Sequence, residues 1–183
     1  PIDDVVHAVN DVLARNVNLV LIAPPGAGKS TRLPLKLIDQ AWLGGQSILL
    51  VVPRRLAALG AARRMAGELG QAVGQQVGHR VRFDTKVGPE TVLEVVTGGV
   101  CTRMIAGDPE LNGVGLVLFD EIHERALDAD VGLALAIESQ SALRPDLRIG
   151  AMSATVEGEA FKELLSTEKP CEQVTSTGAL FPV

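Results

Sequence analysis

Ala23-Pro24-Pro25-Gly26-Ala27-Gly28-Lys29-Ser30 is the most informative segment of the sequence. It follows an apolar run, Asn18 to Ala23, that predicts a buried strand, and it leads into a sequence typical of a helix. A strand, a glycine-rich turn and a helix in this order are typical of a phosphate-binding loop, because backbone N–H groups and the helix N-terminus surround phosphate oxygens. Lys29 adds a positive charge, and Ser30 offers a hydroxyl to Mg²⁺. We therefore expect chemistry on a nucleoside triphosphate.

A second apolar run, from Gly115 to Phe119, ends in two adjacent carboxylates, Asp120 and Glu121. Ligands of an open parallel sheet collect at the carboxyl ends of its strands, so both carboxylates should face the same crevice as Lys29. Asp120 is placed to hold Mg²⁺, and Glu121 to polarise the water that attacks the γ-phosphate. The alternative is that the two acidic residues only cap the following helix.

Composition indicates one α/β domain with an aliphatic core. Of 183 residues, 46% are hydrophobic but only 3% are aromatic, which suits a parallel sheet covered by helices. The formal net charge of −5 argues against coating nucleic acid by bulk electrostatics, so any such binding must be local. The basic residues cluster in two groups, Arg54, Arg55, Arg63 and Arg64 in the first and Arg80, Arg82 and Lys86 in the second. For the first group, the alternative to nucleic-acid binding is a solvated helix face.

The two cysteines suggest neither a zinc site nor a disulfide framework, because Cys101 and Cys171 are far apart and lack metal-ligand spacing. A reduced, cytoplasmic setting fits them best. No apolar run reaches the roughly 18–20 residues needed to cross a bilayer, and the acidic start, Pro1-Ile2-Asp3-Asp4, is unlike a signal peptide. We expect no membrane partner.

Strands and helices are predicted to alternate after an amphipathic N-terminal helix, which implies right-handed crossovers and a mainly parallel sheet. The predicted strands are 18–23, 47–52, 91–96, 115–120 and 147–152, with shorter ones near 77–83 and 171–176. The predicted helices are 29–41, 54–69, 99–106, 128–141 and 157–165.

Taken together, the phosphate loop and the run Asp120-Glu121-Ile122-His123-Glu124-Arg125 resemble the first RecA-like domain of a DEAH-box helicase of superfamily two. Further matches keep the family's order and extend the resemblance to Phe181-Pro182-Val183; they are Pro53-Arg54-Arg55-Leu56-Ala57-Ala58 (motif Ia), Val77-Gly78-His79-Arg80-Val81-Arg82-Phe83, Thr97-Gly98-Gly99 (motif Ib) and Ser153-Ala154-Thr155 (motif III). Within the family, the stretch from Leu127 to Leu135 and the short N-terminal helix look most like the bacterial HrpB type.

The resemblance implies a fold and a set of nucleotide-binding residues. The fold would be a RecA-like P-loop NTPase domain, with ATP and Mg²⁺ bound at the phosphate loop. Ser30 and Asp120 would hold the metal, Glu121 would complete the Walker B pair, and His123 would connect the nucleotide site to motif III. The residues expected to bind ATP are Pro25, Gly26, Ala27, Gly28, Lys29, Ser30, Thr31, Ser153 and Thr155, with Arg64 stacking on the base.

The same resemblance implies contact with a single strand of nucleic acid, which we expect to be RNA, through Arg55, Thr97 and the backbone amides of Gly98 and Gly99. Donors at loop–helix junctions grip phosphates without identifying bases, as movement along any sequence requires. Four residues depart from the family pattern. Ala23 and Ser30 are changes that leave the ATP chemistry intact, whereas Gly98 for Asp or Glu and His79 for Tyr concern strand contact.

Nothing in the sequence resembles the second RecA-like domain with its arginine fingers, so we expect the chain to be the N-terminal half of a two-domain motor whose partner domain belongs to the same parent chain. Two alternatives stay open. One is a P-loop ATPase that moves no strand, and the other is a nucleotide-gated adaptor that binds a protein. Motifs Ia and Ib argue against both, because neither alternative needs them.

Overall fold

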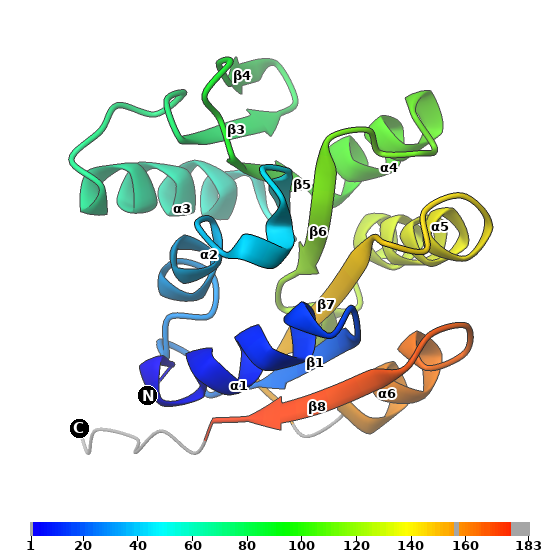
Figure 1. Ribbon diagram of the computed structural model, residues 1–183. Coiled ribbons are helices and arrows are strands. Elements are labelled where there is room, and N and C mark those ends of the chain that lie inside the picture. The colour runs from blue at the N-terminus through cyan, green and yellow to red at the C-terminus, as the bar shows by residue number, and fades with distance from the viewer. Residues whose placement is uncertain (1, 156–157, 177–183) are drawn as a thin grey trace.

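Eight strands form one twisted sheet with helices on both faces in the computed structural model, which describes residues 2–155 and 158–176 (Figure 1). The strand order across the described sheet is β4-β3-β5-β2-β6-β7-β1-β8, and every neighbouring pair is parallel except β3 with β4. The strands are β1 (Asn18–Ile22), β2 (Ser47–Val52), β3 (Val77–Val81), β4 (Asp84–Lys86), β5 (Leu93–Thr97), β6 (Val114–Phe119), β7 (Arg148–Ser153) and β8 (Cys171–Thr175).

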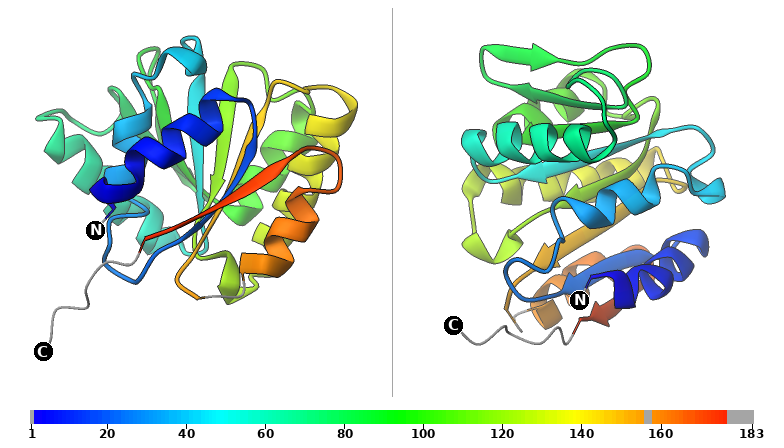
Figure 2. Two further views of the ribbon diagram at one scale, coloured as in Figure 1. Left: turned by 60° about the horizontal axis from the view of Figure 1, so that its bottom comes forward. Right: turned by 90° about the vertical axis from the view of Figure 1, so that its left-hand side faces the viewer.

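Helices cover the two faces as separate layers. They are α1 (Asp3–Ala14), α2 (Arg32–Leu37), α3 (Arg55–Glu68), α4 (Gly98–Gly107), α5 (Leu127–Ala142) and α6 (Gly158–Leu165), with short 3₁₀ turns η1 (Ala41–Leu43) and η2 (Ile122–Glu124). The left view of Figure 2 shows α3 on one side of the sheet and α5 and α6 on the other. Among the described residues, no helix is both long enough and apolar enough to cross a membrane.

Alternation along the central strands builds both cores. Leu19 and Leu21 of β1 pack with the α1–α3 layer, whereas Val20 and Ile22 of the same strand pack with the α4–α6 layer. Every residue of β1 and β6 is buried, as expected for central strands of a parallel sheet covered on both sides. The aliphatic α/β architecture predicted from composition is therefore confirmed.

The predicted strands match the observed ones to within two residues, but two elements differ from prediction. The strand expected at 77–83 ends at Val81, where Arg82 and Phe83 turn the chain into a separate strand, β4. Phe83 has a φ of 65°, a left-handed conformation that suits such a turn. His79, buried in β3, lies with its Nε2 3.3 Å from a carboxylate oxygen of Asp84 in β4.

The helix predicted at 29–41 is wrong in length, since α2 spans only Arg32–Leu37. At its start, the carbonyl of Gly28 accepts hydrogen bonds from the N–H groups of Thr31, Arg32 and Leu33, which keeps residues 29–31 in tight turns. At its other end Gln40 is extended, with ψ of 134°, and this interrupts the helical path before η1. The predicted helix 157–165 begins at a residue outside the described ranges, and its observed part is α6. The resemblance at 181–183 also lies outside them.

The sheet order places the loops that follow five strands along one edge. From β5 through β2, β6 and β7 to β1, the first residues after the strands are Gly98, Pro53, Asp120, Ala154 and Ala23, and Gly98 begins α4 directly. All five strands are parallel, so their carboxyl ends point the same way. The residues predicted to bind a nucleic-acid strand therefore lie at one end of this edge and the phosphate loop at the other, with the loop after β6 between them.

Candidate active site and nucleic-acid interface

The phosphate loop depends on two glycines in left-handed backbone conformations. Gly26 has a φ of 75° and Gly28 a φ of 99°, which residues with a Cβ rarely adopt. A Cβ on Gly28 would also lie 3.1 Å from Ile2 and 3.2 Å from the side chain of Arg32. The turn after β1 is therefore held in a shape that few other residues could maintain.

Lys29 lies at the centre of this loop, with its side chain only 3% exposed. Its Nζ donates hydrogen bonds to the carbonyl oxygens of Ala23 at 2.7 Å and Pro24 at 3.4 Å. A carboxylate oxygen of Glu121 lies 3.7 Å from the same nitrogen. The ammonium group thus faces both the loop and the acidic end of β6, where a phosphate would be held.

Asp120 is a buried carboxylate suited to a cation. Burial raises its pKa to about 6, while a hydrogen bond with Ser30 and the nearby charge of Lys29 act in the opposite direction. Its Oδ1 has no hydrogen-bond partner among the described residues. An unpaired carboxylate oxygen beside a hydroxyl fits Mg²⁺, which prefers oxygen ligands. No group of three or more His, Cys, Asp or Glu side chains in the described ranges could hold a metal, so Mg²⁺ would need further oxygens from phosphate and water.

The turn η2 carries the remaining residues of the β6 loop. It is bounded by Glu121, with a φ of 49°, and Arg125, with a φ of 51°, both left-handed conformations that cost free energy for residues other than glycine. Nδ1 of His123 lies 3.3 Å from a carboxylate oxygen of Glu121 and 3.4 Å from the backbone nitrogen of Ala154. One nitrogen cannot donate to the carboxylate and accept from the N–H at once. With a proton on Nδ1, His123 can donate a hydrogen bond to Glu121; without it, Nδ1 can accept one from the Ala154 N–H.

The segment after β7 is organised by its own hydroxyls. The Ser153 Oγ accepts a hydrogen bond from the Thr155 N–H at 3.1 Å and lies 3.3 Å from the Thr155 Oγ1. Ser153 is buried, whereas Thr155 is exposed. Ser153 is the last residue of β7, the strand next to β1, and its carbonyl accepts a hydrogen bond from the Ala23 N–H at 3.1 Å, so both hydroxyl residues lie near the start of the phosphate loop.

A pocket of about 450 Å³ opens at the phosphate loop. Its lining consists of residues 26–32, Glu121 and, from α3, Arg64. The position of Arg64 fits its expected contact with a base, although its Nε also lies 3.4 Å from Glu68 on the same helix. Pro25 and the deeper residues Asp120, His123 and Ser153, together with Thr155, do not line this pocket.

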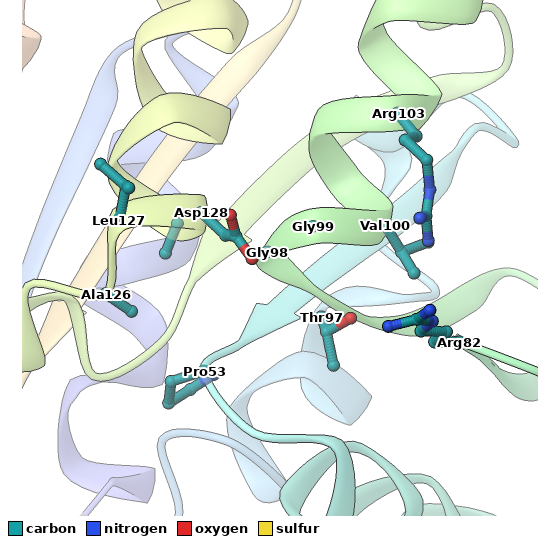
Figure 3. Close-up of a pocket in the computed structure, with 11 residues that line it drawn as sticks. Pro53, Arg82, Thr97, Gly98, Gly99, Val100, Arg103, Ala126, Leu127 and Asp128 are labelled. Atoms are coloured by element: carbon teal, nitrogen blue, oxygen red, sulfur yellow. The ribbon is translucent and has the colours of Figure 1, made fainter.

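A second pocket, of about 420 Å³, lies at the other end of the same edge and contains Thr97, Gly98 and Gly99 (Figure 3). Arg55 is exposed but is not part of its lining. Figure 3 shows Thr97 and Gly98 between Asp128 on one side and Arg82 and Arg103 on the other. The other lining residues are Pro53, Arg82, Val100, Arg103, Ala126, Leu127, Asp128 and Ala129.

Sequence reasoning missed Arg103 and Asp128 as members of this interface. Arg82 belonged to a visible basic cluster, but Arg103 stands alone in the sequence, one helical turn after Gly99. Next to Arg82, the ring of Phe83 is 88% exposed, and the guanidinium carbon lies 4.7 Å from the ring centroid. Basic groups and an exposed ring on this side of the molecule are features that bind nucleic-acid strands.

Close packing of α4 on α5 accounts for Gly98. A Cβ at this position would lie 2.7 Å from the backbone nitrogen of Ala129, so the acidic residue that the family commonly has here would not fit. The Asp128 carboxylate lies 3.1 Å from the position that a Cβ of Gly99 would take. A carboxylate is therefore present at this point of the pocket, but α5 supplies it.

Comparison with known proteins identifies the family to which this fold belongs. The family model described as DEAD/DEAH box helicase matches residues 6–164. The chain belongs to this family of helicases.

Individual relatives agree. The chain is 51% identical over 165 residues to the ATP-dependent RNA helicase HrpB of Escherichia coli (strain K12), which covers 90% of this chain and 20% of that protein. It is 32% identical over 188 residues to the ATP-dependent RNA helicase DHX30 of Gallus gallus, covering 100% of this chain and 15% of that one. The crystal structure of the Escherichia coli DEAH/RHA helicase HrpB superposes with a TM-score of 0.91 at 47% identity, covering 100% of this chain and 23% of that chain. The expected resemblance to the HrpB type is confirmed, and the chain spans about a fifth of the length of the curated relatives it matches.

Proposed function

We propose that this chain is the first RecA-like domain of an ATP-dependent RNA helicase that couples hydrolysis of Mg·ATP to movement along a single strand. The observation that carries the proposal is the presence of two pockets on one sheet edge, one at the phosphate loop and one at Thr97–Gly99. A protein that only hydrolyses ATP needs the first pocket alone. The second would hold the sugar–phosphate backbone through helix α4 and the arginines around it.

In this proposal the nucleotide residues keep the roles expected from the sequence. Lys29 and the loop amides bind phosphates, Ser30 and Asp120 hold Mg²⁺, and Glu121 orients the attacking water. Mg²⁺, when bound, neutralises charge that develops on the phosphate oxygens. Ser153 and Thr155 sense the γ-phosphate, and His123 connects them to Glu121. Arg55 and Thr97, with the backbone of Gly98 and Gly99, hold the strand.

The proposal extends to the parent protein. A second RecA-like domain, in the same chain beyond these residues, would complete the ATP site with arginine fingers, and the parent would work in the bacterial cytoplasm. The share of the relatives' length that this chain covers leaves ample room for such a domain.

Hydrolysis by the full-length parent, measured with and without single-stranded RNA, separates the candidate functions. A helicase should hydrolyse ATP several-fold faster with RNA, a strand-independent ATPase should be equally fast in both conditions, and an adaptor should show almost no turnover in either. Single-stranded DNA of the same length, used in parallel, tests the preference for RNA. Equal rates with and without RNA at low salt would contradict the proposal.

A further inference from the structure

Glu124, in the loop after β6, forms an ion pair with Arg54 in the loop after β2. Neither residue lines either of the two pockets. The Glu124 Oε2 is 3.2 Å from Nη2 of Arg54, the residue just before α3. β2 and β6 are adjacent in the sheet, with Val51 paired to Phe119, so the loops that carry these two side chains emerge side by side. The ion pair thus connects the loop after β2 with the loop after β6, which carries Asp120 and Glu121.

The turn η2 transmits what happens at Glu124, because its other residues contact the nucleotide site. Only Ile122 and His123 separate Glu124 from Glu121, and His123 lies close to both the Glu121 carboxylate and the Ala154 backbone nitrogen. At its far end the turn is held by Arg125, whose Nε lies 3.0 Å from an Asp130 carboxylate oxygen. The turn is short and has left-handed residues at both ends, so a displacement of its backbone at Glu124 would also displace Glu121.

A phosphate of a nucleic-acid strand can compete with Glu124 for the guanidinium of Arg54. The side chains of Arg54 and Glu124 are 74% and 35% exposed, so water screens their attraction and the pair adds little to stability. A phosphate offers the same guanidinium two oxygens in the fork geometry that arginine binds best. Arg54 adjoins Arg55 and follows Pro53, which lines the pocket that contains Thr97. A nucleic-acid strand bound at this pocket would therefore pass within reach of the Arg54 side chain.

We propose, on the basis of the strand-binding function proposed above, that Arg54 is a shared group. Glu124 holds its guanidinium in the absence of a strand, and a strand phosphate takes the guanidinium over and releases Glu124. The contacts of η2 then change, and with them the position of Glu121. Arg54 and Glu124 are therefore positioning residues that link strand occupancy to ATP hydrolysis. Linkage requires the reverse effect as well, so ATP must change strand affinity through the same pair.

The test compares ATP hydrolysis by the full-length parent with its Glu124→Gln variant over a range of single-stranded poly(U) concentrations. Loss of the competing carboxylate should lower the poly(U) concentration for half-maximal stimulation about 2–5-fold. The ratio of stimulated to basal turnover should fall at least threefold, because strand binding no longer alters Glu124. Glu124→Asp keeps the charge and should remain closer to wild type in that ratio. Arg54→Gln should lower the ratio too, but with a raised half-maximal concentration.

Glu172→Gln is the matched control. It makes the same chemical change in another exposed pair, Arg15–Glu172, at the β8 edge of the sheet, and should leave both quantities at wild-type values. A purely structural defect in Glu124→Gln would weaken poly(U) binding and lower the thermal midpoint, and this result would overturn the proposal. So would a wild-type stimulation ratio in Glu124→Gln. If the wild type itself is not stimulated by poly(U), the proposed function fails first and the inference falls with it.

Discussion

Lys29 and Glu121 lie 3.7 Å apart, yet the physical chemistry assigns them different effects. The lysine charge attracts the phosphates of bound nucleotide in every step, so it should contribute to affinity. The Glu121 carboxylate is one residue beyond Asp120, the proposed Mg²⁺ ligand, and should matter when water attacks the phosphate. The two contributions can therefore be separated by substitution.

Glu121→Gln in the parent should reduce turnover at least 100-fold, the lower range of general-base effects, while ATP affinity stays within about threefold of wild type. Lys29→Ala should instead weaken nucleotide binding by at least about tenfold. Equilibrium titration with ATP and steady-state hydrolysis measure the two effects. Near-normal turnover in Glu121→Gln would show that another group activates the water.

Arg64 should stack on any base with similar energy, because a planar guanidinium does not distinguish ring edges. Residues 1–22 contain no glutamine that could recognise adenine. We expect the four nucleoside diphosphates to bind this chain within about tenfold of one another, a spread of about 1.4 kcal/mol. Arg64→Ala should weaken all four by about 2–5-fold, consistent with an exposed stacking contact.

Titration of each diphosphate against wild type and Arg64→Ala provides the measurement. Arg63→Ala is the control, since Arg63 is an exposed neighbour on α3 that does not line the nucleotide pocket. The competing interpretation places Arg64 on the solvated face of α3, paired only with Glu68. No loss of affinity, or a strong preference of the wild type for adenine, would favour that interpretation.

Among the secondary-structure elements, α4 and α5 set the shape of the pocket that contains Thr97, Gly98 and Gly99. Gly98 allows the start of α4 to approach the backbone of α5 at Ala129, and the Thr102 hydroxyl donates a hydrogen bond to the Asp128 carbonyl at 3.2 Å. The pocket that contains Thr97 lies between these two helix starts. Its geometry therefore depends on how closely the helices pack.

Gly98→Ala should destabilise the fold by about 1–3 kcal/mol, since the new methyl group would meet backbone atoms that cannot move aside cheaply. Gly60→Ala is the matched control. Gly60 lies in the exposed part of α3 with open space around it, and the same substitution there should stabilise by about 0.5–1 kcal/mol. Urea unfolding of the three proteins measures the differences. Equal stability of Gly98→Ala and wild type would show that α5 can shift.

At the scale of the whole molecule, the sheet order combines two sites that the sequence separates. Residues of the phosphate loop and of motif Ib are far apart along the chain, but the strands that precede them, β1 and β5, belong to one parallel set whose carboxyl ends share an edge. The β6 loop lies between them and contacts both neighbours, Arg54 on one side and Ala154 on the other.

The isolated chain should bind nucleotide but hydrolyse it very slowly. An arginine finger accelerates related phosphoryl transfers by roughly 10³–10⁵, about 4–7 kcal/mol of barrier, and we expect it from the second domain. RNA should change this slow rate little. Steady-state hydrolysis by the purified chain, with the full-length parent as control, is the measurement. Parent-like turnover on addition of RNA would contradict the two-domain requirement.

Local sequence determined the elements and the motif residues of this protein. Apolar runs in the sequence predicted the long strands, and the glycines at 26 and 28 with the carboxylates at 120 and 121 indicated a nucleotide site, because such signals depend on neighbouring residues alone. The late start of α2 was not predictable in this way, since it depends on three N–H groups converging on the Gly28 carbonyl.

Contacts between side chains that are distant in the sequence follow from the three-dimensional fold. Arg103 and Asp128 lie in one pocket with Thr97, Arg64 reaches the phosphate loop from α3, and Glu124 pairs with Arg54. The lateral order of strands creates all of these contacts, and the free energy of packing the whole core selects that order. Backbone preference and burial act over a few residues, whereas strand order is a property of the entire chain.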